Sequence, residues 1–338
     1  MRRTELDLCR IAACLMVLFI HTSAELYHIC PIDSGAFVSL SFISTMMRGS
    51  VPVFFMLTGA LFLSREKLEL KSFLIRHPLR LLFLFCFWSL AYALLSRLAS
   101  GSFGSLYDFI YSFVQGHYHL WFLTAMVLCC LFLPVAHAAI HGGKLPLGYL
   151  LFLFFGVSIL FANFNLTPDT APILYRITLN FSFDYLPYLG YAVWGYWLSG
   201  KDFKKGWLII APAVFLLVTA ITTWGNIWYS NYKQVADGWL FSYFSLPSLI
   251  QATMIFCFFQ ALKDREFKHP RLWAVLADAT LGIYLLHPML INILQLLGFN
   301  MSLDRPVLSV LGFTAVLALV CTLLALAGKK IPLIRKLL

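Results

Sequence analysis

The sequence predicts an all-α polytopic membrane protein, and three observations support this fold class. Hydrophobic residues make up 61% of the chain, charged residues make up only 12%, and the mean hydropathy is +0.83. Soluble globular domains carry about twice that share of charged residues. Nearly all of the 338 residues fall into apolar runs separated by short polar connections. We therefore expect a single transmembrane domain over residues 1–338, with no appended soluble domain.

Ten apolar runs have the length of about 20 residues that a helix needs to cross a bilayer. They are 8–29, 40–63, 78–97, 118–138, 145–163, 183–200, 207–227, 239–262, 272–298 and 306–327. We find no internal repeat and no low-complexity tract among them. The sequence therefore predicts about ten transmembrane helices.

The distribution of lysine and arginine predicts the orientation. If the N-terminus is cytoplasmic, the connections that follow alternately collect most of the 25 basic residues. The basic residues outside that set are Arg48, Arg97, Arg176, Lys233 and Arg305. This asymmetry is what the positive-inside rule predicts, and it places both termini in the cytoplasm. It also accounts for the net charge of +10, so that no nucleic-acid partner is expected.

The first run is predicted to be a retained helix rather than a cleaved signal peptide. Glu5 and Asp7 precede it, whereas the start of a signal peptide is positively charged. The run contains Arg10 and, eleven residues later, His21. At about 100° per residue these two lie within about 20° of one another around the helix and about 16 Å apart along it. Cys14, Val17 and Glu25 continue the same stripe.

Ionisable groups inside a membrane normally face the protein interior or a water-filled cavity and mark a functional path. His21 is therefore a candidate catalytic residue, with a buried structural histidine as the alternative. Arg10 is a candidate ligand-binding residue or an anchor that snorkels to the interface, with Asp7 as a possible partner. Glu25 either orients His21 or is simply solvated.

Further candidates follow in the later spans. Arg48 opens the apolar part of the second run, and Pro52 and Gly59 permit a kink and a close helix approach there. Arg76 and Arg80 are four residues apart around Pro78, which we expect to begin the third span. Arginine side chains match phosphate oxygens in geometry and charge, so this pair predicts a phosphate-binding site.

The fourth and ninth spans add aromatic and histidine candidates. His119 and Trp121 begin the fourth span, where aromatic belts are common. His287 lies near the middle of the ninth span, directly before Pro288. A His-Pro pair in a span predicts a packing or catalytic role. No spacing of histidine, cysteine or acidic residues predicts a metal site.

Five stretches, in order along nearly the whole chain, resemble the acyltransferase 3 family of bacterial membrane O-acyltransferases, and most closely its stand-alone members. They are ELDLCRIAACLMVLFIH, SVPVFFMLTG, RHPLR, HLWFL and LGIYLLHP. The family signature of an arginine, ten residues and a histidine corresponds here to Arg10 and His21. Glu25 lies outside that pattern.

The resemblance implies acyl transfer in a bacterial inner membrane. The donor is expected to be cytoplasmic acetyl-CoA, a co-substrate rather than a permanently bound cofactor. The acceptor is expected to be a hydroxyl of a glycan or lipid-linked envelope molecule at the outer face. Arg10, Arg76 and Arg80 would hold the CoA phosphates, and His21 would act as general base or as acyl-carrying nucleophile. The candidates for the cavity or acceptor site are Arg48, Trp121, His119, His287 and Glu25.

Two other classes of protein remain open at this point. A transporter of a glycan or small metabolite also needs many spans and buried charges. However, we see no corresponding pair of Gly/Pro-broken helices in two halves. A structural or sensory subunit would leave the stripe from Arg10 to His21 unexplained. Binding of acyl-CoA distinguishes the enzyme from both.

Overall fold

The computed structural model describes residues 2–101, 105–143, 145–156 and 187–338. All regular secondary structure in these ranges is helical, which confirms the predicted fold class. Eight helical stretches in them are long and apolar enough to cross a membrane. They correspond to predicted spans one to four and seven to ten. The protein is a multi-pass membrane protein with a bilayer as its surroundings.

The helices before the gap at 157–186 follow one another closely. They are α1 (Thr4–Tyr27), α2 (Gly35–Met46), α3 (Ser50–Phe62), α4 (Leu70–Arg76), α5 (Pro78–Ser100), α6 (Leu106–Gln115), α7 (Trp121–His141), α8 (Leu147–Leu151) and the π-helix η1 (Phe152–Gly156). Those after it are α11 (Pro187–Ser199), α12 (Trp207–Lys233), the 3₁₀ helix η2 (Trp239–Phe241), α13 (Leu246–Gln260), α14 (Pro270–Leu296), α15 (Pro306–Gly328) and α16 (Pro332–Arg335). The fifth and sixth predicted spans lie partly outside the described residues, so a total of ten spans stays a prediction.

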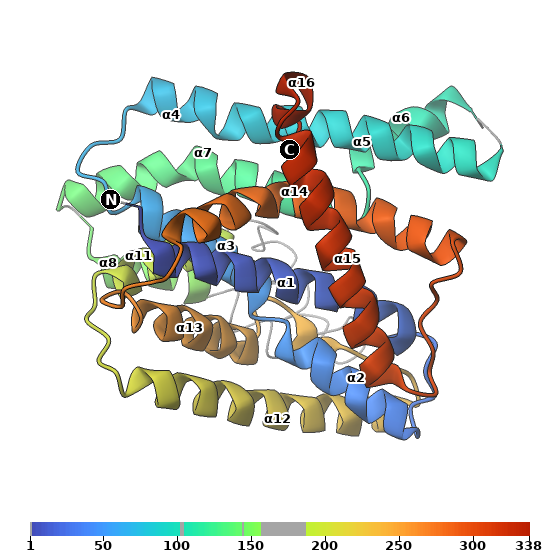
Figure 1. Cartoon of the computed structure of the whole chain (residues 1–338). Coiled ribbons are helices and arrows are strands. Elements are labelled where there is room, and N and C mark those ends of the chain that lie inside the picture. Colours follow the sequence, from blue (N-terminus) through green and yellow to red (C-terminus); the bar gives the residue numbers. More distant parts are fainter. Residues whose placement is uncertain (1, 102–104, 144, 157–186) are drawn as a thin grey trace, which may run out of the picture.

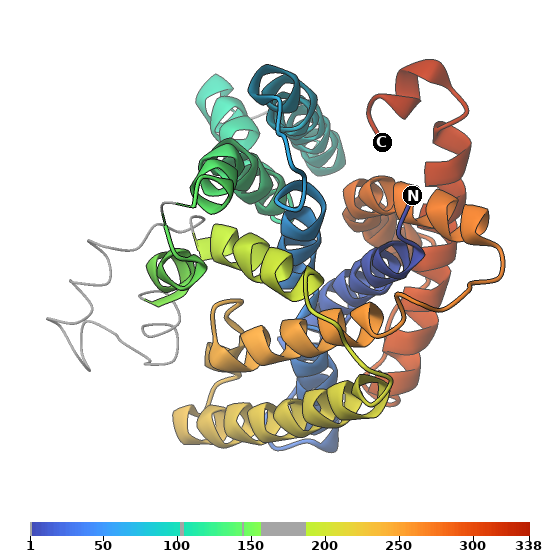
Figure 2. The ribbon, with the colours of Figure 1, turned by 90° about the vertical axis from the view of Figure 1, so that its left-hand side faces the viewer.

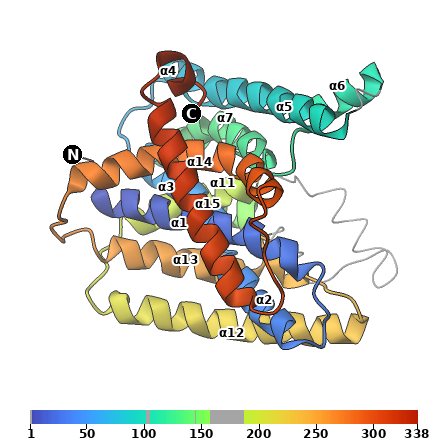
Figure 3. The same ribbon diagram turned by 45° about the vertical axis from the view of Figure 1, so that its right-hand side comes forward.

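The long helices form a bundle with two distinct ends (Figure 1). The N-terminus, α4 and the start of α14 lie at one end, which we call the basic end because Arg76 and Arg271 are there. Figure 2 looks onto this end, with the N-terminus toward the viewer. The helix α6 lies at the opposite end. In Figure 3, α15 passes diagonally across α1 and α14. The cytoplasmic location of the basic end stays a prediction.

The second span is interrupted where the sequence predicted one continuous segment. It consists of α2 and α3, and the break at 47–49 lies before Pro52 rather than at it. Pro52 is in the first turn of α3, where its missing N–H leaves no hydrogen bond unmade. At Gly49 a Cβ would lie 3.0 Å from the Ala252 backbone nitrogen on α13, so the break passes close to another helix.

The helices α3 and α11 make the closest approach in the described bundle. A Cβ on Gly59 would lie 1.7 Å from the Ala192 carbonyl oxygen, and one on Gly195 would lie 2.2 Å from the Met56 carbonyl oxygen. Small residues on both sides let helix backbones approach where lipid supplies no hydrophobic driving force. The predicted role of Gly59 in a close helix approach is confirmed.

The third span begins at Pro78, as predicted, because proline is favourable in the first turn of a helix. Arg76 and Arg80 do not share one continuous helix, however. Arg76 is the last residue of α4, and Arg80 lies in the first turn of α5. The chain bends at His77, whose φ and ψ are −108° and −73°. Both arginines nevertheless reach the same cavity.

Candidate active site

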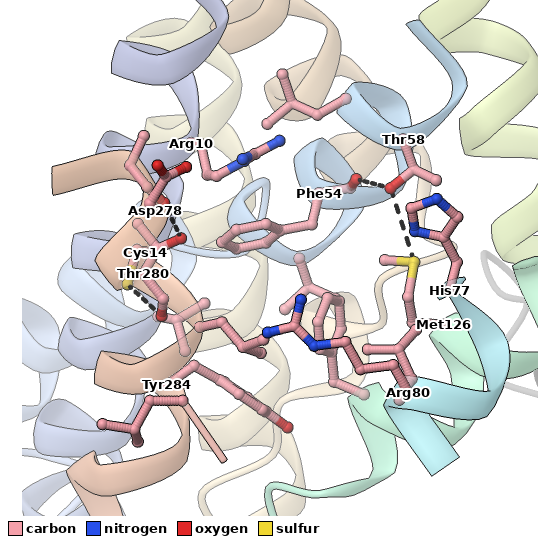
Figure 4. A pocket seen from close by; sticks show the side chains of 18 of the residues that line it. Arg10, Cys14, Phe54, Thr58, His77, Arg80, Met126, Asp278, Thr280 and Tyr284 are labelled. Carbon is pink, nitrogen blue, oxygen red and sulfur yellow. Dashed lines mark hydrogen bonds between the residues drawn. The ribbon is translucent and has the colours of Figure 1, made fainter. Parts of the chain in front are cut away.

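A cavity of about 1000 Å³ runs into the bundle from the basic end, lined by α1, α3, α4, α5, α7, α14 and the chain after α15. It unites six of the residues predicted for the site. They are Arg10, His21, Arg76, Arg80, His119 and Trp121. Figure 4 shows the guanidinium groups of Arg10, from α1, and Arg80, from α5, pointing into this space from different sides. Residues far apart in the sequence therefore line one ligand-sized space.

The stripe along α1 faces the cavity over its middle portion only. Arg10, Cys14, Val17 and His21 are lining residues. Glu25 is exposed and accepts a hydrogen bond of 2.5 Å from the Gln295 side chain. The carboxylate of Glu25 is therefore engaged outside the cavity.

Asp7, the expected partner of Arg10, is bound by another arginine. The Arg2 guanidinium lies 2.6 Å from one Asp7 oxygen and 2.8 Å from an Asp278 oxygen, so it bridges the starts of α1 and α14. Within the described part of the chain, the Arg10 guanidinium has no hydrogen bond or ion pair. Arg10 is half-buried and directed at the cavity. It therefore retains its capacity to bind an anion.

The mouth of the cavity is strongly positive. Arg76 and Arg80 are exposed, and neither forms an ion pair within the described ranges. Lys329 and Arg335 also line the mouth, and Asp278 is the one acidic side chain among the described lining residues. Several cations around one space favour a polyanion such as a phosphate-bearing ligand. Lys329 and Arg335 were not predicted as site residues, because in the sequence they only belong to a basic run that is expected to be cytoplasmic.

Histidine rings meet at the inner end of the cavity. The ring of His21 lies 4.8 Å, centroid to centroid, from that of His287, and the His287 ring lies 5.3 Å from that of His119. The Nδ1 atoms of His117 and His119 lie 2.9 Å apart. These residues come from α1, from α14 and from the turn before α7. His117 had not been chosen from the sequence, although it stands two residues before His119.

Pro288 sets the protonation of its neighbour His287. Proline has no N–H, so the carbonyl of Tyr284, four residues earlier, loses its helical partner. His287 Nδ1 lies 2.6 Å from that carbonyl oxygen. A carbonyl oxygen only accepts, so Nδ1 carries the proton and Nε2 carries the lone pair. The Nε2 atom is buried and has no hydrogen-bond partner among the residues that the structure describes.

The next turn of α14 is held by Tyr92 of α5. Its hydroxyl donates to the Leu285 carbonyl at 2.8 Å and accepts from the Met289 N–H at 3.3 Å. The Tyr284 hydroxyl in turn donates to the His119 carbonyl. These contacts tie α5, α14 and the turn before α7 together, so the histidine rings are held by hydrogen bonds from their neighbours.

The contact between His117 and His119 requires at least one uncharged ring. Burial lowers the pKa of His117 to about 4, so it is neutral at pH 7. Two imidazolium rings would both donate, whereas a 2.9 Å contact between Nδ1 atoms needs one donor and one acceptor. The Nε2 atom of His119 is buried without a partner. His119 lines the cavity, whereas the ring of His287, predicted as a site residue, is fully buried behind it and is not a lining residue.

Arg48 does not line the cavity. It lies at the break between α2 and α3, with its guanidinium carbon 4.3 Å from the centroid of the Phe241 ring. Trp121 lines the cavity and stacks on Tyr243 at 5.6 Å. Within the described ranges, no group of three or more His, Cys, Asp or Glu side chains is arranged to hold a metal ion.

The cavity combines a cationic mouth with a cluster of imidazole rings. A sequence comparison identifies the family to which the chain belongs. The family model for acyltransferase 3, described as "Acyltransferase domain", matches residues 3–326. The chain belongs to the acyltransferase 3 family. As a member of this family, it is a membrane acyltransferase. Neither a curated protein nor a solved structure matches the chain significantly.

Proposed function

We propose that this acyltransferase 3 protein moves an acyl group, most simply acetyl, from acyl-CoA to a hydroxyl of a cell-envelope glycan or related acceptor. The observation that carries the proposal is one cavity with unpaired arginines at its mouth and histidines at its inner end. About 16 Å of helix axis separates Arg10 from His21. The enzyme acts in a bacterial inner membrane, with acetyl-CoA as a cytoplasmic co-substrate and no permanently bound cofactor.

The mouth binds the nucleotide part of the donor. Arg10, Arg76 and Arg80 hold the phosphates, because guanidinium groups form paired hydrogen bonds with phosphate oxygens. Lys329 and Arg335 add charge at the same wall. The uncharged acyl-pantetheine arm then extends along α1 past Cys14 and Val17 toward His21.

His21 acts on the acceptor hydroxyl as a general base. Its ring nitrogen takes the hydroxyl proton while the hydroxyl oxygen attacks the thioester carbonyl carbon. The C–S bond then breaks, and the protonated His21 returns the proton to the CoA thiolate. The buried ring of His287 packs 4.8 Å from that of His21, centroid to centroid, and supports its position.

The second role for His21 is nucleophilic. In that case the imidazole attacks the thioester, CoA leaves as the thiol, and the acyl-imidazole is then attacked by the acceptor hydroxyl. We favour the general base, because histidine is the side chain that most often takes this role in proton transfer. The two routes give different results when the protein is incubated with a labelled acyl donor and no acceptor. The nucleophilic route leaves the label on the protein, whereas the general-base route does not.

The proposal is tested by measuring acetyl-CoA binding and slow thioester cleavage in lipid nanodiscs. Arg76→Ala should lose binding, whereas His21→Ala should bind acetyl-CoA and fail to cleave it. Arg271→Ala and His28→Ala are matched controls, because both residues are exposed and neither lines the cavity. Wild-type protein that does not bind acetyl-CoA would overturn the proposal and favour transport of a glycan or small metabolite.

A further inference from the structure

A second cavity, of about 690 Å³, lies at the end of the bundle away from the basic mouth. It is formed by the last turns of α5, by α6 and by the segment that leads into α7. This second cavity lies outside the proposed acyl-CoA site. Its volume is within the range of small-molecule binding sites.

The lining of this second cavity is chemically unlike the basic mouth. Tyr92, Tyr118 and Trp121 contribute aromatic rings, and among the described lining residues Arg97 is the one with a permanent charge. Ser96, Ser112 and Gln115 add hydroxyl and amide groups. Such groups both donate and accept hydrogen bonds, and aromatic rings offer flat apolar faces. A sugar ring, with hydroxyls at its edge and C–H groups on its faces, matches this combination.

The two cavities are neighbours, with the histidine cluster and Trp121 at their shared wall. Trp121 lines both of them. His117 lines the second cavity and is hydrogen-bonded to His119, which lines the first. The ring of Tyr118 lies 5.3 Å from that of His21, centroid to centroid. A hydroxyl presented from the second cavity therefore approaches His21 from the side opposite to the acyl-CoA mouth.

Contacts of Tyr92 hold the wall of the second cavity, and the same residue holds α14 beside the histidine cluster of the first cavity. His117 stacks on Tyr92 at 4.3 Å, and the Tyr92 hydroxyl is held by the backbone of α14 beside His287. The Ser89 hydroxyl donates to the Phe113 carbonyl and ties α5 to α6. A site held in this way loses little conformational entropy when it binds a ligand.

The helix α6 presents an apolar stripe to the surroundings beside this cavity. The exposed residues of the stripe are Leu106, Tyr107, Ile110, Tyr111 and Val114. Their spacing puts them on one side of the helix, which suits contact with lipid at a membrane surface. A sugar carried on a lipid could therefore reach the cavity from the bilayer as readily as a soluble sugar from water.

We propose that the cavity between α5, α6 and the start of α7 binds the acceptor as a glycosyl unit and presents one of its hydroxyls to His21. This inference rests on the proposed acyl transfer and adds the acceptor site to it. A soluble sugar and a sugar anchored to lipid present the same chemistry to this cavity, and the experiment separates the two sources.

The test uses full-length protein in proteoliposomes with labelled acetyl-CoA. The acceptor probes are p-nitrophenyl β-D-glucopyranoside, dodecyl β-D-glucopyranoside and dodecanol, which has a hydroxyl but no sugar ring. Wild type should acetylate a glucoside with saturation and leave dodecanol unmodified. A lower KM for the dodecyl glucoside would indicate a lipid-anchored acceptor, and a lower KM for the nitrophenyl glucoside would indicate a soluble one.

Two substitutions fill the cavity from facing helices, Ser96→Trp on α5 and Ser112→Trp on α6. Each should raise the glucoside KM by about tenfold or more, because the ring loses its space. Thioester cleavage without acceptor should stay at the wild-type rate. Leu95→Trp is the matched control, since Leu95 is exposed on α5 and lines neither cavity.

Three results would overturn the acceptor site. They are unchanged glucoside kinetics in both cavity-filling variants, acylation of dodecanol as efficient as that of the glucosides, and absence of glucoside acylation by wild type that still cleaves acetyl-CoA. Failure of the proposed function gives a different result. Wild type would then neither bind nor cleave acetyl-CoA, and the acceptor site would be rejected together with the donor site.

Discussion

The rings of His21 on α1 and His287 on α14 lie 4.8 Å apart, centroid to centroid, at the inner end of the cavity. Neither ring nitrogen of His21 is hydrogen-bonded within the described residues, and His287 is bound only through Nδ1. The pair therefore combines one ring that is free to exchange a proton with one whose protonated nitrogen is set by the backbone. This arrangement supports the following predictions.

Replacing His21 should remove acyl transfer without removing donor binding. We expect His21→Ala to lower kcat by about 10²- to 10⁴-fold, the usual contribution of a general base. Acid-quenched wild type incubated with labelled acetyl-CoA alone should carry no label on the protein. Label attached to His21 in stoichiometric amount would instead establish the nucleophilic route.

The arginines at the mouth should act on the nucleotide part of the donor only. Arg10→Ala and Arg80→Ala should each raise the KM for acetyl-CoA by about tenfold, because a charge-assisted hydrogen bond contributes about 1.5–3 kcal/mol. Acetyl-pantetheine lacks the nucleotide, so its KM should not respond to either change. Steady-state kinetics with the two donors measure this difference. An equal rise in KM for acetyl-CoA and for acetyl-pantetheine would contradict a contact between these arginines and the phosphates.

Pro288→Ala should impair chemistry through His287. The substitution restores an N–H four residues after Tyr284, and this group competes with His287 Nδ1 for the same carbonyl. We expect kcat to fall by about tenfold, with an unchanged KM for acetyl-CoA and a shifted pH–rate profile. Pro212→Ala, in the interior of α12, is the control and should leave both values unchanged. Wild-type kcat in Pro288→Ala would show that the tautomer of His287 is unimportant.

Gly59→Ala should destabilise the fold. The added Cβ would lie 1.7 Å from the Ala192 carbonyl oxygen, so α3 and α11 would have to separate. Overpacking of this kind costs about 1–3 kcal/mol, and the thermal midpoint of unfolding in detergent should fall accordingly. Gly312→Ala on α15 is the matched control, because nothing lies within 4 Å of its added Cβ. Equal midpoints for the two variants would contradict the close helix approach.

Acid should destabilise the protein through His117. Its pKa in the folded state is lowered to about 4 by burial, below the value of about 6.5 for an unperturbed histidine. The unfolded state therefore binds the proton first, and the stabilisation is complete above about pH 6.5 and is lost as the pH falls toward 4. Thermal midpoints measured across this interval should fall less steeply for His117→Gln than for wild type. Identical slopes would show that His117 does not titrate in this way.

The fold class, most of the spans, and Arg10 and His21 as candidates on α1 could be predicted from the sequence alone. The lengths of apolar runs and the spacing of Arg10 and His21 are local properties of the chain, so they can be recognised without tertiary structure. Pro78 was likewise predicted to begin a helix, because its effect on the backbone is local. The same holds for the candidates Arg76 and Arg80, although the bend at His77 was not predicted.

Contacts between side chains of different helices could be identified only from the tertiary structure. A helical stripe shows which residues share a face but not which helix packs against that face. Asp7 is therefore bound by Arg2 rather than Arg10, and Glu25 and Arg48 lie outside the cavity. The roles of Lys329, Arg335, Tyr92 and His117 depend on packing between distant segments, as does the capture of the Tyr284 carbonyl by His287. Such contacts have no periodic signal in the sequence, because they are set by side-chain fit between helices.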